Sequence, residues 1–341
     1  MTEVSYATRE QVQAQLEILS TARASSVIDS KIRAASRGIE GLCHRRFYPE
    51  KKTLKFDWPN YQYADTWTLY LDGNDLISID TMTSGGTAIP STDYILRKGD
   101  DKDEPPYTRI EINTSTNSVF QSGTTTQQSI VISGTWGYND VDTTVVTGSI
   151  YAPAVYTDQV VYISSYAGTW DIGTNDIIKC GTELMIVKSK AMSAIGGQAT
   201  TATLTANSAD KLVGVTSGSA YAVGSVLLIG AERMRIDDIA GNNLLVTRAF
   251  DGTTLTTHSI GEAIYALQAC TLQRGALGTI AEGHTASSYV YTFKCPSLVN
   301  ELCVLETVAL LVKPSKPSQE LANLRETTQC TYGRVGRIGA I

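Results

Sequence analysis

The feature that most constrains the fold is a repeat in the second half of the chain. An arginine is followed four residues later by Gly-Thr and ten residues later by histidine, and this pattern occurs twice at an offset of 26 residues. A glycine at the turn and polar side chains that hold the backbone are typical of a structural loop. The repeated positions are Arg248, Gly252 and His258 in the first copy and Arg274, Gly278 and His284 in the second.

A second internal match lies nearby and has the composition of a strand. The heptapeptide that starts at Gly181, Gly-Thr-Glu-Leu-Met-Ile-Val, matches the one that starts at Gly230, Gly-Ala-Glu-Arg-Met-Arg-Ile. In the second copy apolar residues alternate with arginines, which predicts a half-buried strand. The surrounding region, 141–291, is rich in Thr, Ser, Ala and Gly and shows no long amphipathic helix. We therefore expect an inserted, mainly β domain with internal repeats over these residues.

The N-terminal region has helical periodicity instead. Thr8 and Gln11 fit a capping box at the start of a short helix. A second helix is predicted from about Ser25 to Arg46, where apolar residues recur at spacings of three and four. Its basic residues off that stripe fit a solvated face or a contact with DNA or an acidic partner. The apolar stripe consists of Ile28, Ile32, Ala35, Ile39 and Leu42.

From Thr53 the period changes to two, and short strands separated by glycine turns continue to the stretch Ser129–Tyr138. A strongly apolar helix follows only at Leu298–Val312. This helix would extend about 22 Å, which is less than a hydrocarbon core of about 30 Å. We expect it to pack with the strands before residue 140. The net charge of −6 disfavours a general nucleic-acid binder.

The order of these elements resembles the head–tail connector (adaptor) proteins of long-tailed bacteriophages. The resemblance covers roughly residues 6–139 and 295–315. It departs from the family in the long insert, because the family's last helix follows its Trp-Gly-Tyr strand after a short loop. The motifs that carry it are the two N-terminal helices, Leu69-Tyr-Leu71, Leu76-Ile-Ser-Ile79, Asp93-Tyr94, the strand Ile130-x-Ile-x-Gly-x-Trp-Gly-Tyr138 and the apolar helix after Pro296.

The resemblance implies an α+β fold. A connector domain of N-terminal helices, a small antiparallel sheet and a C-terminal helix would comprise residues 1–140 and 292–315. The mainly β insert would occupy 141–291, and its repeats are similar to small β modules of phage structural proteins. A C-terminal arm would comprise 316–341. Deleting about 141–291 and joining the ends is then expected to leave a folded connector domain.

The resemblance also implies a function in virion assembly. The protein would be a structural part of the virion, assembled in the host cytoplasm and placed at the head–tail junction. It would form a homo-oligomeric ring, expected to be a dodecamer, that lines part of the DNA channel without sequence-specific DNA binding. Its partners would be the phage portal protein and a tail-side connector, stopper or tail terminator protein. No cofactor, metal, membrane contact or enzymatic activity is expected.

The C-terminal arm is the region where the resemblance suggests partner contacts. Prolines at 314 and 317 end the preceding helix, and glycines, two arginines and scattered apolar residues follow. Such a tail either stays disordered or becomes ordered against a neighbouring subunit or the portal. The proposed contact residues are Arg325, Tyr332, Arg334, Val335, Arg337, Ile338 and Ile341.

The sequence was also searched for features of metal sites, enzymes and glycan-binding proteins. His258 and His284 suit a metal or acid–base site by type, but no His-x-His or His-Glu-x-x-His spacing accompanies them. The chain has no P-loop and no Gly-x-Ser-x-Gly motif, so a hydrolase is not favoured. Trp170 fits either an exposed contact or core packing. The main alternative is a tail-associated protein that binds a host surface or glycan through the β insert, which glycan binding by 141–291 would reveal.

Overall fold

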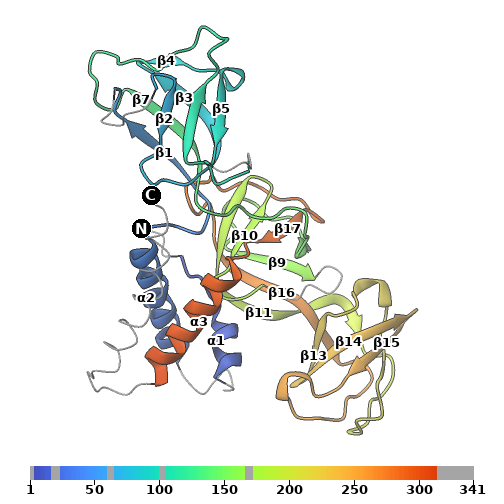
Figure 1. Ribbon diagram of the computed structural model, residues 1–341. Coiled ribbons are helices and arrows are strands. Elements are labelled where there is room, and N and C mark those ends of the chain that lie inside the picture. The colour runs from blue at the N-terminus through green and yellow to red at the C-terminus, as the bar shows by residue number, and fades with distance from the viewer. Residues whose placement is uncertain (1–3, 17–23, 60–64, 100–103, 166–171, 313–341) are drawn as a thin grey trace.

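The computed structural model describes residues 4–16, 24–59, 65–99, 104–165 and 172–312. These residues form three α-helices and mostly antiparallel sheets, so the expected α+β class is confirmed. Figure 1 shows a group of helices at one side, a sheet lobe at one end and a further β region that extends away from both.

The helices are α1 (Arg9–Gln15), α2 (Ser25–Cys43) and α3 (Ser297–Val312). The predicted capping box is confirmed at α1, where the Thr8 hydroxyl accepts a hydrogen bond from the Gln11 amide and the Gln11 side chain accepts one from the Thr8 amide. The predicted end of α2 was wrong by three residues, because His44 takes a left-handed conformation (φ 52°) and ends the helix at Cys43.

Leu42, at the end of α2, is also not the core residue that the helical stripe predicted. Its exposed fraction is 68%, whereas Ile39, three residues earlier, is buried. Phe47 and Tyr48 follow the bend at His44 and are both buried in the same core. Because these two aromatic side chains continue the core beyond Ile39, Leu42 is left on the surface.

The sheet lobe comprises residues 50–136 and has a core of its own (Figure 1). Its four-stranded sheet has the order β1-β7-β3-β4, and its three-stranded sheet has the order β2-β6-β5. Trp58 and Trp136 are buried in the lobe, whereas Trp67 is 42% exposed. The strands are β1 (Glu50–Phe56), β2 (Thr68–Tyr70), β3 (Leu76–Ser84), β4 (Thr87–Ala88), β5 (Tyr94–Arg97), β6 (Arg109–Ile112) and β7 (Ile130–Trp136).

The β region after the sheet lobe forms two closed barrels on one shared ribbon. The ribbon consists of β11 and β16, which pair antiparallel from Ile186↔Gln273 to Ala199↔Ala263. At one end β11 and β16 are joined through β10, β17, β8 and β9, which closes a six-stranded barrel. The strands are β8 (Gly148–Ile150), β9 (Val160–Ser165), β10 (Ile177–Cys180), β11 (Glu183–Ala199), β16 (Ala263–Gln273) and β17 (Tyr289–Thr292).

The second barrel lies at the other end of the ribbon. Here β16 continues into the order β13-β14-β15-β12, and a bridge between Thr200 and Val215 returns the sheet to the end of β11. We call the first barrel barrel A (147–193 with 268–292) and the second barrel B (194–267). The chain of barrel B therefore interrupts that of barrel A. The remaining strands are β12 (Leu212–Gly214), β13 (Val226–Ile229), β14 (Glu232–Ala240) and β15 (Asn243–Thr247).

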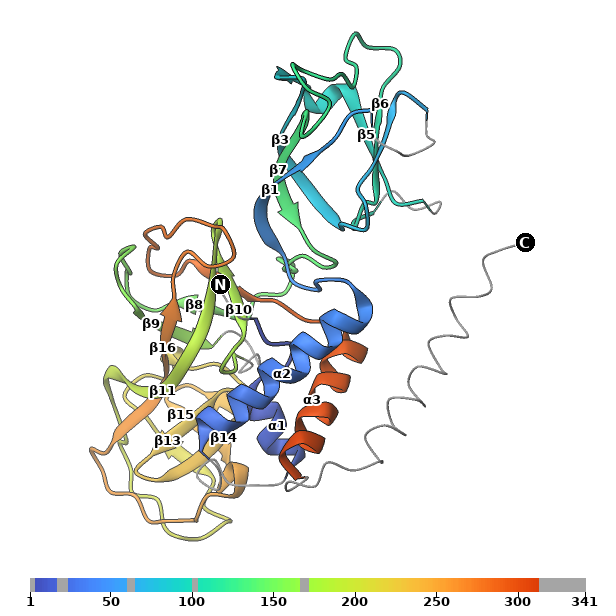
Figure 2. The ribbon, with the colours of Figure 1, turned by 90° about the vertical axis from the view of Figure 1, so that its left-hand side faces the viewer.

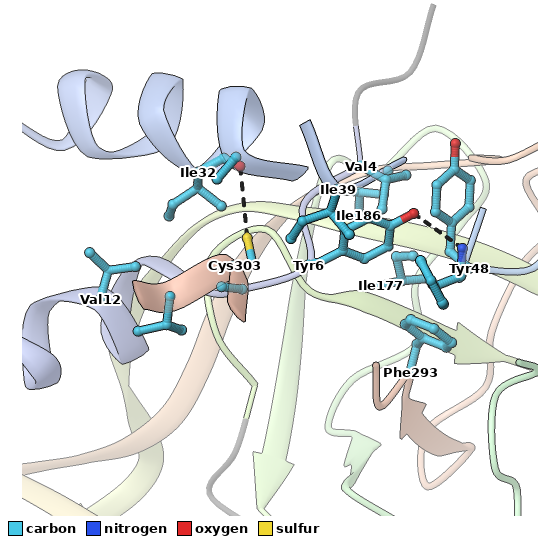
Figure 3. Packing of buried hydrophobic residues seen from close by; sticks show 14 of the residues in the cluster. Val4, Tyr6, Val12, Ile32, Ile39, Tyr48, Ile177, Ile186, Phe293 and Cys303 are labelled. Atoms are coloured by element: carbon cyan, nitrogen blue, oxygen red, sulfur yellow. Dashed lines mark hydrogen bonds between the residues drawn. The ribbon is translucent and has the colours of Figure 1, made fainter. Parts of the chain in front are cut away.

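The three helices pack on one another and on barrel A (Figures 2 and 3). Cys303 of α3 lies against α2, with its sulfur 3.4 Å from the Ser36 hydroxyl. Ile177 and Ile186 of barrel A enter the same core beside Phe293. The core that α3 shares with the first two helices and barrel A contains no buried residue of β7, but Tyr138, at the end of the stretch Ser129–Tyr138, is half-buried against it. The predicted division into connector domain, insert and arm stays a prediction.

Candidate functional site

The repeated loops each hold an arginine and a histidine against a buried glutamate. In barrel B the carboxylate of Glu232 accepts hydrogen bonds from Arg248 Nε (2.7 Å) and Nη2 (2.8 Å). His258 Nε2 lies 2.9 Å from the same carboxylate. The exposed fractions of these three side chains are 0–2%. Barrel B thus contains a buried Glu-Arg-His triad with a bidentate ion pair.

Barrel A contains the same triad. Glu183 accepts from Arg274 Nε and Nη2, both at 2.8 Å, and His284 Nε2 lies 2.8 Å from it. The glutamates occupy matching positions in the Gly181 and Gly230 heptapeptides, and both of those glycines have positive φ (60° and 58°). The hairpins β10–β11 and β13–β14 therefore present a carboxylate at the same point of each barrel.

The arginines also tie three chain segments together. Arg248 Nη1 donates to the carbonyls of Thr205 and Asp210, and Arg274 Nη1 donates to those of Val155 and Asp158. Each histidine forms a backbone bridge to the first of these segments, His258 with Leu204 and His284 with Ala154. Each triad thus links three parts of its barrel: the hairpin that carries the glutamate, the repeated loop that carries the arginine and histidine, and the segment whose carbonyls accept from the arginine.

Electrostatics keeps both carboxylates ionised. Burial raises the pKa of Glu232, but hydrogen bonds from Arg248, from the backbone amides of Thr256 and Ala249, and from His258 outweigh it and lower that pKa to about 2. The pKa of Glu183 is lowered in the same way, with burial opposed by Arg274, the amides of Gly275 and Glu282, and His284. A charge buried in this way is stable only because it is fully paired.

The triads have no geometry for catalysis or metal binding. Their glutamates and histidines are buried and hydrogen-bonded within the loop, so none of these groups faces a substrate. Over the described ranges no group of three His, Cys, Asp or Glu residues is placed to hold a metal ion. The arrangement can fix a loop, and it offers no nucleophile or general base to solvent.

The two repeated glycines differ in what surrounds them. Gly252 and Gly278 both have positive φ (71° and 78°), as the turn requires. A methyl group at Gly252 would meet no atom within 4 Å, whereas one at Gly278 would overlap the Lys51 carbonyl oxygen. The amide of Lys51 donates to the Leu277 carbonyl at 2.8 Å. The loop of barrel A therefore docks on β1 of the sheet lobe, and that of barrel B has no such contact at its glycine.

The repeat in the sequence identifies the arginines, glycines and histidines of the two loops. It does not show that Glu183 and Glu232 are the partners of the arginines and histidines. A signal was present, since both glutamates occupy the third position of the repeated heptapeptide. The distance along the chain hid the connection in barrel A. Arg248 follows Glu232 by 16 residues, but Arg274 follows Glu183 by 91, because barrel B is inserted between them.

A second feature with functional potential is an apolar seam on α3. Leu298, Leu305 and Val312 are 66%, 51% and 57% exposed and recur every seven residues. Leu302 and Ala309 lie between them at spacings of four and three, and both are half-buried. This is the heptad spacing by which helices pack against one another. The opposite side of α3 is occupied by the core residues Cys303, Val304, Thr307 and Leu311.

The remaining residues of interest from the sequence lie elsewhere. Arg37, one of the basic residues off the apolar stripe of α2, pairs with Glu40 at 2.7 Å and donates to the Val4 carbonyl, so it is engaged within the N-terminal region. Trp170 lies outside the described residues, as do all seven proposed contact residues of the arm: Arg325, Tyr332, Arg334, Val335, Arg337, Ile338 and Ile341.

A comparison with known protein families, curated proteins and solved structures finds no match for this chain. Within the part of the chain that the structure describes, no helix combines the length and hydrophobicity needed to span a bilayer.

Proposed function

We propose that this protein is a structural subunit of a phage virion that forms a ring below the portal and joins the head to the tail. The observation that carries the proposal is the apolar seam of α3, which has the spacing of a helix–helix contact and leaves Leu298, Leu305 and Val312 more than half exposed among the described residues. A helix of 16 residues offers about 24 Å of such a seam. A neighbouring copy would cover it in a ring.

The rest of the molecule suits an assembly part. The helices, the sheet lobe and barrel B extend in different directions (Figure 1), which gives one subunit several separate surfaces for neighbours above, below and beside it. The two barrels are fastened internally by buried ion pairs, as suits a part that must hold its shape in an assembly. The proposed partners remain other copies of this chain, the portal protein and the next tail-side protein.

The proposal includes a DNA channel with an acidic wall. Each subunit carries a net charge of −6, so a ring of about 12 copies would repel rather than hold phosphate groups. DNA would then pass without sequence-specific binding. We place barrel B on the outer rim, because it lies far from the sheet lobe and projects from the helices (Figure 1).

The seam is tested by changing one residue and measuring mass. Leu305→Glu places a charge at the centre of the seam, and we expect the purified chain to change from rings to monomers in mass photometry. Ile280→Glu is the matched control, because Ile280 is 85% exposed and lies in the repeated loop of barrel A rather than on α3. A wild-type chain that stays monomeric at all concentrations would argue against self-assembly through the seam.

The position in the virion needs a separate experiment. Labelling or reconstruction of purified particles should place the protein at the head–tail junction with its barrels outside the channel. A location elsewhere in the particle, or absence from it, would contradict the proposal even if the purified chain forms rings.

A further inference from the structure

A second exposed apolar surface lies on the outer wall of barrel A. Tyr151 follows β8, Val160 and Tyr162 lie in β9, and their exposed fractions are 43%, 45% and 41%. The Tyr151 amide donates to the Tyr162 carbonyl at 2.8 Å, which places these two residues opposite each other. Val161 and Ile163, which alternate with the exposed residues of β9, are buried in the barrel. We call the surface formed by Tyr151, Val160 and Tyr162 the β8–β9 wall.

Barrel B shows that the fold does not require the tyrosines of this wall. The backbone bond from Tyr151 to Tyr162 has its counterpart in a bond of 2.9 Å from the Thr201 amide to the Gly214 carbonyl. Barrel B closes around a core of its own with Thr and Gly at these two positions. The aromatic rings of barrel A are thus not needed for closure, and large apolar side chains gathered on one exposed wall indicate an interaction surface.

The β8–β9 wall lies on the side of barrel A that faces away from the helices. The strands follow one another around the barrel in the order β11-β10-β17-β8-β9-β16. Ile177 of β10 and Leu184 and Ile186 of β11 reach outward into the helical core, whereas β8 and β9 belong to the other half of the barrel. Figure 2 shows this arrangement, with α3 at the right and β8 and β9 at the left. One subunit therefore presents an apolar helix on one side and an apolar sheet wall on the opposite side.

We propose that the α3 seam of one copy packs on the β8–β9 wall of the next copy. This inference rests on the proposed ring and names the surface that covers the seam. A ring needs a heterologous contact, in which two different surfaces of the same chain meet. Closure around many copies requires these two surfaces to lie on opposite sides of the subunit, as the seam and the wall do. A contact of α3 with α3 would instead give a twofold dimer.

The shape of the wall suits a helix with large side chains. Tyr162 pairs with Ala269 of β16, and Ala269 pairs with Ala191 of β11. These three side chains point outward together, because residues paired across antiparallel strands share a face of the sheet. The two tyrosines thus form a ridge beside a strip of small residues. The seam of α3, with Leu305 at its centre, can lie along this strip against the ridge.

The charges of the two surfaces are also compatible. Between Ser297 and Val312, α3 has the exposed acidic residues Glu301 and Glu306 and no basic residue. The strands β8, β9 and β16 contain no acidic residue that would repel them. Lys179 of β10 lies on the outside of the same barrel, two strands from β8, and adds a positive charge. The wall therefore favours an acidic, apolar helix, which α3 of the next copy provides.

The first test uses equivalent residues of the two barrels. Val160 of barrel A and Leu212 of barrel B lie two residues before Tyr162 and Gly214 and are 45% and 58% exposed. Val160→Glu places a charge on the wall, and we expect it to raise the concentration at which half of the chains form rings at least tenfold in mass photometry. Leu212→Glu is the matched control and should leave ring formation unchanged. Thermal melting establishes that both variants are folded. If Val160→Glu is not, Tyr151→Thr takes its place, because barrel B has Thr at this position.

Disulfide cross-linking then tests which surfaces meet. The background is Cys43→Ser and Cys330→Ser, which removes the exposed native thiol and the cysteine of the C-terminal arm. A chain that also carries Leu305→Cys and Tyr162→Cys should give a ladder of covalently linked copies after mild oxidation. Chains with only one of these two substitutions should run as monomers on a denaturing gel.

The outcomes separate this contact from the proposed function. Rings weakened by Val160→Glu but not by Leu212→Glu, together with a ladder from the double-cysteine chain alone, support the contact. Rings that resist Val160→Glu, equal weakening by both variants, a missing ladder or a covalent dimer from Leu305→Cys alone would overturn the contact and leave self-assembly standing. A wild-type chain that stays monomeric would contradict the proposed self-assembly and this contact with it.

Discussion

Barrel A and barrel B contain the same buried triad, but the side chains on their outer surfaces differ. Both close around a Glu-Arg-His triad with matching hydrogen bonds. On the outside, Leu184 and Leu277 of barrel A are buried against the helices. The equivalent residues of barrel B, Arg233 and Asp251, are exposed and form an ion pair with each other. The triad therefore stabilises the barrel, whereas a few outward side chains determine whether the barrel docks on the rest of the molecule.

The barrel cores explain why the interior can stay constant. The buried strands of each barrel carry Ile, Val, Leu and Met in alternation with outward residues. Changing an outward residue leaves this pattern intact, because successive side chains of a strand point to opposite faces. Barrel A could therefore acquire an apolar docking face without losing its closure.

The largest expected effect comes from removing one barrel or both. Replacing 195–264 by Asn-Gly joins Ala194 to Tyr265, which are paired in the ribbon, through a hairpin turn. We expect this chain to keep its helices and sheet lobe. Deleting 141–291 removes Ile177 and Ile186 from the helical core and should unfold the helices, contrary to the expectation from sequence. Far-UV circular dichroism during heating distinguishes the two deletion variants. Because the sheet lobe has a core of its own, only a cooperative loss of helical signal in the larger deletion would show that the helices do not need barrel A.

Breaking one triad at a time should destabilise different parts of the molecule. Glu183→Gln and Glu232→Gln each leave a buried arginine without its counter-charge, which costs about 3–5 kcal/mol. Loss of Glu232 should raise amide exchange only in barrel B. Loss of Glu183 should raise it in barrel A and in the helices, because Leu184 next to it packs in the helical core. Hydrogen exchange with mass spectrometry measures both. Equal exchange patterns in the two variants would contradict separate roles.

Acid should destabilise barrel B through its carboxylate. The pKa of Glu232 is about 2 in the folded chain and near 4.5 as its ordinary value. Because the folded pKa is lower, this group stabilises the fold fully above pH 4.5, and the contribution is lost as pH falls toward 2. The loss amounts to about 3 kcal/mol. Urea unfolding between pH 6 and pH 2, compared with Glu232→Gln, tests it. The variant's stability should change less with pH over this range.

The smallest expected effect concerns the two repeated glycines. Gly252→Ala and Gly278→Ala both place a methyl group at a positive φ, which costs about 1 kcal/mol. Only the change at Gly278 also pushes against the Lys51 carbonyl, so we expect it to cost at least about twice as much and to weaken the contact between barrel A and β1. The free energy of unfolding measures the first effect, and amide exchange at Lys51 measures the second. An equal loss of free energy of unfolding at both sites would show that the contact with Lys51 can shift without an energetic penalty.

The local elements and the repeats could be predicted from the sequence alone. The capping box at Thr8, the alternation at Met234 and Ile236, and the paired Arg, Gly and His positions all followed from spacing. These features depend on residues close together in the chain, where a period of two or of 3.6 and a positive φ leave a direct trace.

Which elements meet could not be predicted from local patterns. The fold places Glu183 against Arg274 across 91 residues, packs α3 with the N-terminal helices and barrel A, and leaves Leu42 exposed. The physical reason is that contacts between distant segments depend on the register of the ribbon β11–β16 and on which outward side chains are apolar. A short-range pattern shows that a strand has a buried face. The closure of the barrel determines which residues pack against that face.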